Sequence, residues 1–290
     1  MSARAGVIVI ALAALAAGCG GQGQTPAHAE IAYINRVNAI EKQLAPPLLA
    51  VSRAAAGFAA HSSPSTAAAR ARARASTRRD AAALAGGLAR IQALRGTLAA
   101  LDAPPAASRL RALILRLVDQ QAYLTGQTEK LVTFLPGFTA DLRPLPAATV
   151  RLERVLSISQ AYGAAAVQRV YAEKAAALRQ FATSVQAIIH RLRRLAVPQV
   201  SQPGYRAQIG SLRGMSVSAG KLAGAIGAGP APAVSKLLVA FDRAAASNQT
   251  GAVRRAQIAA IKAYDAQTTR LNTLAAQAQT ERARLAASLP

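Results

Sequence analysis

Residues 84–101 read Leu84-Ala-Gly-Gly-Leu88-Ala-Arg-Ile91-Gln-Ala-Leu94-Arg-Gly-Thr-Leu98-Ala-Ala-Leu101, and this stretch decides the fold. Its large apolar side chains recur every three or four residues, which places them on one face of an α-helix. A helix with such a stripe is stable only when the stripe packs against other helices. The same spacing returns along most of the chain. We therefore predict an all-α protein, an elongated up-and-down bundle of long helices.

Proline, glycine and loop residues divide this pattern into segments. We expect a break or kink at Pro46-Pro47 and a helix end at Pro136-Gly137. A stretch of nearly fifty residues after Ala147 would be one helix of about 75 Å, unless Gly163 kinks it. The expected helices cover residues 31–58, 67–101, 110–134, 147–197, 205–226, 234–246 and 251–288.

The helical part of the chain also predicts an internal duplication. A shift of 94 residues brings the 84–101 stretch onto residues 178–195, so that Leu84 falls on Leu178 and Pro104 on Pro198. Tyr171 and Tyr264 each precede a leucine by seven residues. The expected organisation is a signal peptide (1–18), a flexible tether (19–29), a first helical repeat (30–137), a Pro-rich connector (138–146) and a second helical repeat (147–290), with one continuous bundle as the alternative.

The N-terminus carries an export signal. Arg4 precedes the uninterrupted apolar run 6–17, which is too short to cross a bilayer as a helix. Ala16, Ala17 and Gly18 then lead to Cys19, the chain's one cysteine. This pattern resembles the signal of bacterial lipoproteins, although the family's usual leucine three residues before the cysteine is Ala16 here. An ordinary signal peptide cleaved nearby is the alternative interpretation.

The resemblance implies that the Cys19 thiol receives a diacylglyceryl group and that the signal is removed just before it. A single cysteine cannot form an internal disulfide, which agrees with a different use. Two acyl chains give stable anchoring, whereas one is marginal. We therefore expect a protein held by Cys19 on the extracytoplasmic face of a cell membrane. The polar tether gives the helical part a reach of roughly 17 Å.

The chain is strongly basic, with 35 Lys and Arg against 12 Asp and Glu and a formal net charge of +23. An anionic partner would explain this excess: phospholipid headgroups or a cell-wall polymer. A GC-rich genome, which favours Arg, Ala, Gly and Pro codons together, would explain it equally well. An exported chain rarely meets nucleic acid, so we predict no nucleic-acid partner.

Candidate residues for this contact form two basic groups. Arg70, Arg74 and Arg78 lie at i, i+4 and i+8, where like charges destabilise a helix unless they are solvated or meet anions. The candidate anion-binding residues are Arg70, Arg72, Arg74, Arg78, Arg79, Arg191, Arg193 and Arg194. A solvated helix surface is the alternative interpretation for both groups.

Catalytic and metal-binding patterns are missing from the sequence. The three histidines, His28, His61 and His190, have no metal-ligand spacing, and no Glu-x-x-His occurs. No nucleophile elbow, phosphate-binding glycine loop or paired carboxylate motif is present either. We predict no enzyme, no cofactor, no metal site and no catalytic residue.

Polar residues on apolar faces form the remaining candidate site. A small molecule between helices would use such residues, whereas buried tyrosines and amides that bond to the protein itself would also explain them. The candidates are Gln120, Gln121, Tyr123, Tyr171 and Tyr264, with Thr125 beside them. The predicted function is a scaffold or interaction module, with a protein partner or self-association left open. The alternative is a lipoprotein that holds a small ligand between its helices.

Overall fold

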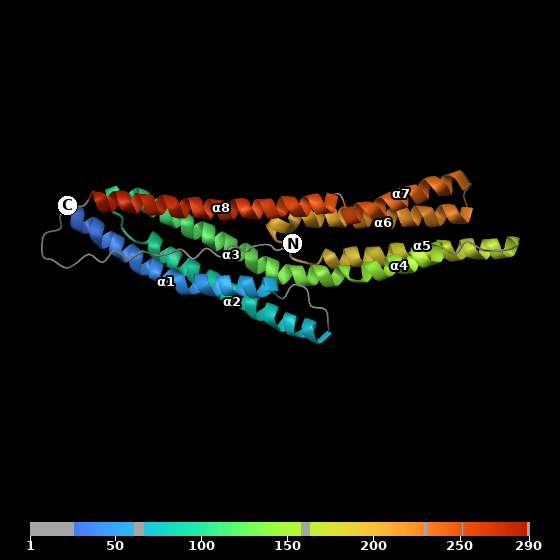
Figure 1. Ribbon diagram of the computed structural model, residues 1–290, viewed down its shortest axis with the longest axis horizontal. Coiled ribbons are helices and arrows are strands. Elements are labelled where there is room, and N and C mark those ends of the chain that lie inside the picture. Colours follow the sequence, from blue (N-terminus) through green and yellow to red (C-terminus); the bar gives the residue numbers. More distant parts are fainter. Residues whose placement is uncertain (1–25, 61–66, 158–162, 229–230, 251, 289–290) are drawn as a thin grey trace. The chain divides into compact units, whose positions relative to one another are not determined.

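The computed structural model describes residues 26–60, 67–157, 163–228, 231–250 and 252–288 (Figure 1). Within these ranges the chain is all-α and contains no strand, which confirms the predicted fold class. The signal segment and most of the tether lie outside them. The α-helices are α1 (Pro26–Ala60), α2 (Ala67–Ala99), α3 (Ser108–Leu142), α4 (Pro144–Leu156), α5 (Ala164–Leu192), α6 (Gln202–Ala228), α7 (Ala231–Thr250) and α8 (Ala252–Ala287), with single 3-10 turns η1 (Pro105–Ala107) and η2 (Gln199–Ser201).

The chain divides into two compact units. The first unit consists of residues 1–133 and 264–290, and the second of residues 134–263. The second unit is therefore inserted in the sequence of the first, and α3 and α8 each supply residues to both. This division does not coincide with the predicted one at residues 138–146, which placed the whole C-terminal helix in the second repeat.

The predicted helix end at Pro136 and the predicted Pro-rich connector are wrong. Helix α3 continues through Pro136 to Leu142, and α4 begins at Pro144, so only Arg143 separates them. A proline in the first turn of a helix is tolerated because its missing N–H would have no intrahelical acceptor. Pro144 and Pro146 occupy that first turn. They therefore start α4 and do not form an irregular linker.

Helix α1 also runs through its two prolines, where we expected a break or kink. An interior proline costs about 3 kcal/mol or more. Side chains on both sides of Pro46-Pro47 are buried, with Val37, Ile40 and Leu44 before them and Val51 and Ala54 after them. Burial of several aliphatic side chains at about 1.5–3 kcal/mol each outweighs that cost.

The first unit packs its core between α1, α2, the first part of α3 and the last part of α8. Helices α1 and α2 lie side by side (Figure 1). Leu84, Ile91 and Leu98 of α2 lie on one helical face, and all three are buried, as their spacing predicts. The main core cluster of the first unit consists of Tyr33, Val37, Ile40, Leu44, Ile91, Leu98, Ala107, Leu110, Leu113, Ile114, Val118, Leu274, Ala278 and Leu285.

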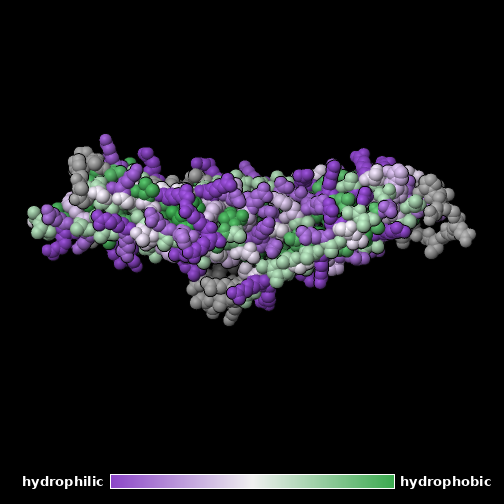
Figure 2. All heavy atoms as spheres, turned by 180° about the vertical axis from the view of Figure 1, so that it is seen from behind, coloured by the Kyte–Doolittle hydropathy of each residue, from purple (hydrophilic) through white to green (hydrophobic). Residues whose placement is uncertain are grey.

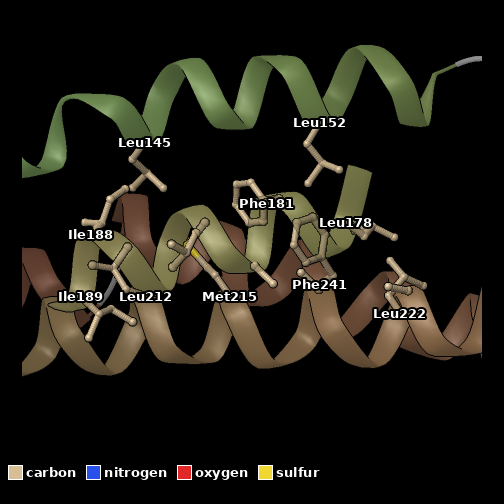
Figure 3. Packing of buried hydrophobic residues seen from close by; sticks show 14 of the residues in the cluster. Leu145, Leu152, Leu178, Phe181, Ile188, Ile189, Leu212, Met215, Leu222 and Phe241 are labelled. Carbon is tan, nitrogen blue, oxygen red and sulfur yellow. The ribbon is translucent and has the colours of Figure 1, made fainter. Parts of the chain in front are cut away.

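The second unit packs α4, α5, α6 and α7 around its own core. Figure 3 shows Leu145 and Leu152 of α4 pointing at the face of α5 that carries Phe181 and Ile188. The rings of Phe181 and Phe241 meet edge to face, with centroids 5.9 Å apart. Such a contact contributes about 0.5–1.5 kcal/mol beyond the area that it buries. Each unit therefore has a core of its own.

Several local elements recur at the predicted shift of 94 residues. Leu84 and Leu178, 94 residues apart, are both fully buried. The 3-10 turns η1 and η2 begin at Pro105 and Gln199, and α3 and α6 begin at Ser108 and Gln202, each pair again 94 residues apart. Pro104 and Pro198 precede the two turns with φ/ψ of −56°/151° and −59°/146°. Both units therefore contain the same helix, 3-10 turn and helix in the same register.

The long helix expected after Ala147 is in fact two helices, α4 and α5. In the sequence, Gly163 was the residue at which that helix could be interrupted. Gly163 directly precedes α5 with φ 89° and ψ 150°. This backbone conformation is essentially restricted to glycine. Glycine at this position therefore permits the backbone conformation from which α5 begins.

Gly86 and Gly87 provide a matched test of the α1–α2 contact. A Cβ at Gly87 would lie 2.6 Å from Val51 Cγ2, whereas one at Gly86 would meet nothing within 4 Å. Alanine is about 1 kcal/mol better than glycine in an open helix position. Overpacking of a tight contact costs about 1–3 kcal/mol. We expect Gly86→Ala to raise the free energy of unfolding in urea and Gly87→Ala to lower it, and equal effects of the two would contradict this packing.

Candidate functional site

The predicted basic group at the start of α2 lies on a helix. Arg70, Arg74 and Arg78 are all within α2, so their backbone positions share one helical face. The side chains of Arg78 and Arg79 are exposed. Those of Arg70, Arg72 and Arg74 lie outside the described part of the structure.

The second basic group, at the end of α5, is partly used within the protein. Arg191 Nε lies 3.2 Å from Asp141 Oδ1, and Arg194 Nη2 lies 3.1 Å from His190 Nδ1. Arg193 is exposed. Cations at a helix C-terminus also stabilise it through the helix dipole. This group therefore has a structural role, which weakens it as a dedicated anion site.

The predicted polar residues are only partly brought together. Gln120 is buried, and its Nε2 donates to the backbone oxygen and to Oε1 of Gln267, both at 3.1 Å. The hydroxyl of Tyr264 lies 3.0 Å from Thr128 Oγ1. These contacts join α3 to α8 inside the first unit. Tyr171 belongs to the second unit and is half exposed, so it takes no part.

The other members of that set do not line a shared cavity. Tyr123 is 37% exposed, and Gln121 is partly buried. Thr125 is buried and donates to the backbone oxygen of Gln121 at 2.8 Å within α3 itself. Gln127, which the sequence reasoning missed, is buried, and its Oε1 has no protein partner. Its position seven residues after Gln120, two helical turns on, was the available clue.

Buried charges are the feature that sequence reasoning overlooked. Glu41 of α1 is buried in an ion pair with Arg282 of α8, residues separated by 241 positions in sequence. The other carboxylate oxygen of Glu41, Oε2, and Arg282 Nε have no partner. The sequence did contain an indication of this burial, because Glu41 follows Ile40 and lies between the apolar residues Val37 and Leu44. Its burial needs an opposite charge from another helix.

The buried carboxylate of Glu281 forms a second ionic cluster in the first unit, with two arginines that are themselves exposed. Its Oε1 accepts from Arg284 Nη2 at 2.6 Å, and Oε2 lies 3.6 Å from Arg109 Nε. Arg284 also reaches the backbone oxygen of Ala106 at 3.5 Å. The hydrogen bonds from Arg284 hold the pKa of Glu281 below its usual value. This cluster ties the end of α8 to the turn between α2 and α3.

Glu41 and Tyr33 titrate abnormally because they are buried. Burial raises the pKa of the Glu41 carboxyl above its usual value, and the charge and hydrogen bond of Arg282 only partly oppose this. Burial likewise raises the pKa of the Tyr33 hydroxyl, with Arg111 acting in the opposite direction. Arg111 itself donates to the backbone oxygen of Ala99, the last residue of α2. Arg111 therefore stabilises the end of α2, and Glu41 stabilises the contact between α1 and α8.

The raised pKa of Glu41 predicts a pH effect. The folded protein binds a proton more tightly here than the unfolded chain does, so this group favours folding more as the pH falls towards its ordinary pKa, 4.5. As the pH falls from 7 to 4.5, we expect the unfolding free energy of the wild type to increase relative to that of Glu41→Gln, which has no carboxyl to titrate at this position. Urea unfolding at several pH values measures it, and a shift in the opposite direction would contradict the assignment.

A shallow cavity of about 60 Å³ lies between α4 and α5, lined by Ala148, Arg151, Leu152, Val155, Ala177, Gln180, Phe181 and Ser184. Pockets for small molecules usually measure about 300–1,000 Å³. Ser184 Oγ donates to the backbone oxygen of Gln180, so that hydroxyl is already used. The cavity offers little room for a ligand.

Comparison with known proteins gives no further lead. No family model matches the chain, and neither the curated proteins nor the solved structures include a match. Among the described residues, no three His, Cys, Asp or Glu side chains are grouped to hold a metal ion. No described helix is both long and apolar enough to span a membrane.

Proposed function

We propose that this chain is an extracytoplasmic lipoprotein, anchored through Cys19, that acts as a non-enzymatic scaffold or interaction module and contacts anionic membrane or cell-wall surfaces. The anchor rests on the export signal that ends at Cys19, which lies outside the described residues. The contact rests on the charge of the helical units. Protein partners would be held by the exposed helix faces.

The distribution of charge is the observation that carries the contact. The second unit contains 17 Lys and Arg against 4 Asp and Glu, an excess of 13 positive charges in 130 residues. Figure 2 shows hydrophilic side chains over much of the face that it presents. A field of one sign attracts surfaces of the opposite sign and raises the rate of encounter. This supports a cationic module.

The interior polar groups support a scaffold more than a ligand-binding protein. Gln120 binds Gln267, Tyr264 meets Thr128, and Glu41 pairs with Arg282. Each of these side chains uses hydrogen-bonding capacity on the protein itself. A small-molecule site needs polar groups that converge on an open cavity. The alternative of a ligand held between helices therefore has less support.

The anchor is tested by labelling. The full chain is produced in a bacterial host fed an alkyne fatty acid, and the fatty acid is detected on the purified protein. We expect label on the wild type and none on Cys19→Ser, because acylation needs the thiol. Label that persists on Cys19→Ser, or an unlabelled wild type, would refute the lipid anchor.

The surface contact is tested with vesicles. Residues 19–290 carrying Cys19→Ser are sedimented with phosphatidylglycerol-containing and neutral vesicles over a salt series. Each basic residue at an anionic surface contributes about 1 kcal/mol, so replacing Arg70, Arg74 and Arg78 by Gln should weaken binding roughly 100-fold if α2 makes the contact. The matched control replaces three basic residues of the same unit, Arg90, Arg116 and Arg270, which are exposed. Equal losses would remove the α2 group from the proposal.

A further inference from the structure

One face at the start of α8 combines exposed apolar and basic side chains. Arg254, Arg255, Ile258, Ile261 and Lys262 follow one another at helical spacing and are all exposed. Residues three or four apart in a helix are neighbours on its surface. Ile258 and Ile261 therefore form an apolar patch with a basic residue one turn before it and another directly beside it. We call these five residues the α8 basic–apolar face.

The two isoleucines of this face are both exposed, one helical turn apart. Ile258 is 44% and Ile261 62% exposed, although both are large aliphatic residues that usually pack inside. A similar pattern precedes them in α7 of the same unit, where exposed Val239 lies between Lys236 and Arg243. Asp242 and Asp265 are the nearest acids, and residues 243–264 contain none.

The chemistry of this face selects its partner. A soluble polyanion would satisfy the arginines and the lysine but would offer no apolar surface for Ile258 and Ile261. A second copy of the chain would bring another second unit with its own excess of 13 positive charges, and the two would repel each other. An anionic bilayer presents negative headgroups directly above hydrocarbon. Arg and Lys can keep their charges at the headgroups while their stems lie along the apolar layer.

We infer that the α8 basic–apolar face inserts Ile258 and Ile261 into the boundary of an anionic phospholipid bilayer, while Arg254, Arg255 and Lys262 bind the headgroup phosphates. This inference rests on the proposed function, because an anchored chain is held beside such a surface. It adds a defined contact that is partly apolar. The contact therefore keeps part of its strength at salt concentrations that screen charge.

Single-cysteine probes test the insertion directly. With Cys19→Ser the chain contains no cysteine, so Ile258→Cys can be labelled alone with an environment-sensitive fluorophore. We expect a blue shift and a rise in emission on phosphatidylglycerol vesicles, and no change on neutral vesicles. Leu238→Cys on α7 is the matched control, since Leu238 is 41% exposed in the same unit and has no basic residue three or four positions away. A spectrum of the Ile258 probe that stays unchanged, or that changes no more than the control, would overturn the inference.

Sedimentation separates the two components of the contact. Ile258→Ser with Ile261→Ser should weaken binding about tenfold, and this loss should persist at high salt. Arg254→Gln, Arg255→Gln and Lys262→Gln together should weaken it about 100-fold at low salt. The controls are Val150→Ser with Leu238→Ser, and Arg169→Gln, Arg179→Gln and Arg206→Gln together, all exposed positions of the second unit. Circular dichroism checks that every variant is folded.

The outcomes distinguish this inference from the proposed function. Losses in the α8 variants that exceed those in their controls support it. If the α8 variants and their control variants weaken binding equally, the inference is overturned, and a diffuse contact through many basic residues remains the explanation. Competition by soluble polyphosphate at every salt concentration, with no effect of the isoleucine substitutions, also overturns it and favours a charged polymer. If the unlipidated chain binds no vesicles at low salt, the inference fails together with the anionic-membrane contact, while fatty-acid labelling at Cys19 still decides the anchor.

Discussion

Replacing Arg282 by methionine is expected to lower the free energy of unfolding of the first unit by about 3 kcal/mol, because breaking a buried ion pair leaves an uncompensated charge. The Glu41 side chain is 9% exposed and receives its hydrogen bond from Arg282, while Oε2 has no partner. Methionine keeps much of the length and apolar contact of arginine but removes the charge. Urea unfolding followed by circular dichroism measures the loss. Hydrogen exchange should locate it in α1 and α8.

Two further variants make this prediction specific. Arg270→Met, an exposed position on the same helix, should change stability by less than 0.5 kcal/mol or thereabouts. The double variant Glu41→Leu with Arg282→Met should recover most of the loss, since buried pairs are often replaced by apolar residues without cost. If Arg282→Met costs no more than Arg270→Met, the pair does not hold α8 to α1.

Leu178→Ala is expected to destabilise the second unit by about 3 kcal/mol, within the range of 2–5 kcal/mol found for leucine truncation in well-packed cores. Leu178 is fully buried in the core of α4, α5, α6 and α7 (Figure 3). The loss combines the removed methyl and methylene groups with the cavity that they leave. Hydrogen exchange followed by mass spectrometry should show lower protection in α4–α7 and unchanged protection in α1 and α2.

Leu84→Ala provides the matched comparison, because Leu84 is equally buried at the corresponding position of the first unit. It should lower protection in α1 and α2 and leave α4–α7 unchanged. Leu238→Ala, at a position 41% exposed, controls for the substitution itself and should cost less than about 1 kcal/mol. Equal loss of protection in both units after either core substitution would show that the chain unfolds as one cooperative structure, contrary to the division into two cores.

Much of the fold was readable from the sequence because helix periodicity is a local property. Leu84, Ile91 and Leu98 are spaced for one helix face, and all three are buried in the structure. The shift of 94 residues likewise predicted equivalent positions that prove equally buried. The prediction was wrong at the prolines. It placed a break at Pro46-Pro47 and a helix end at Pro136, but these residues lie inside helices. The local sequence indicates the free-energy cost of an interior proline. It does not show how many apolar side chains on either side of the proline become buried and offset that cost.

The candidate site was readable only in part. Gln120 and Tyr264 were chosen as polar residues on apolar faces, and the structure gives each a partner across the α3–α8 contact, Gln267 and Thr128. No spacing in the sequence predicts which residue 147 positions away will accept a hydrogen bond. Tyr171 matched the same pattern but is half exposed in the other unit. An isolated polar residue does not reveal which neighbour it will have.

The sequence by itself determined the helices, their buried stripes and the excess of positive charge, because each follows from residues close together in the chain. The tertiary structure alone decided that the end of α8 returns to the first unit, that Glu41 is neutralised by Arg282, and that Ile258 and Ile261 remain exposed. All three depend on which helix packs against which. An apolar stripe requires a partner but does not specify one, since burial is non-directional and any complementary helix face can provide it.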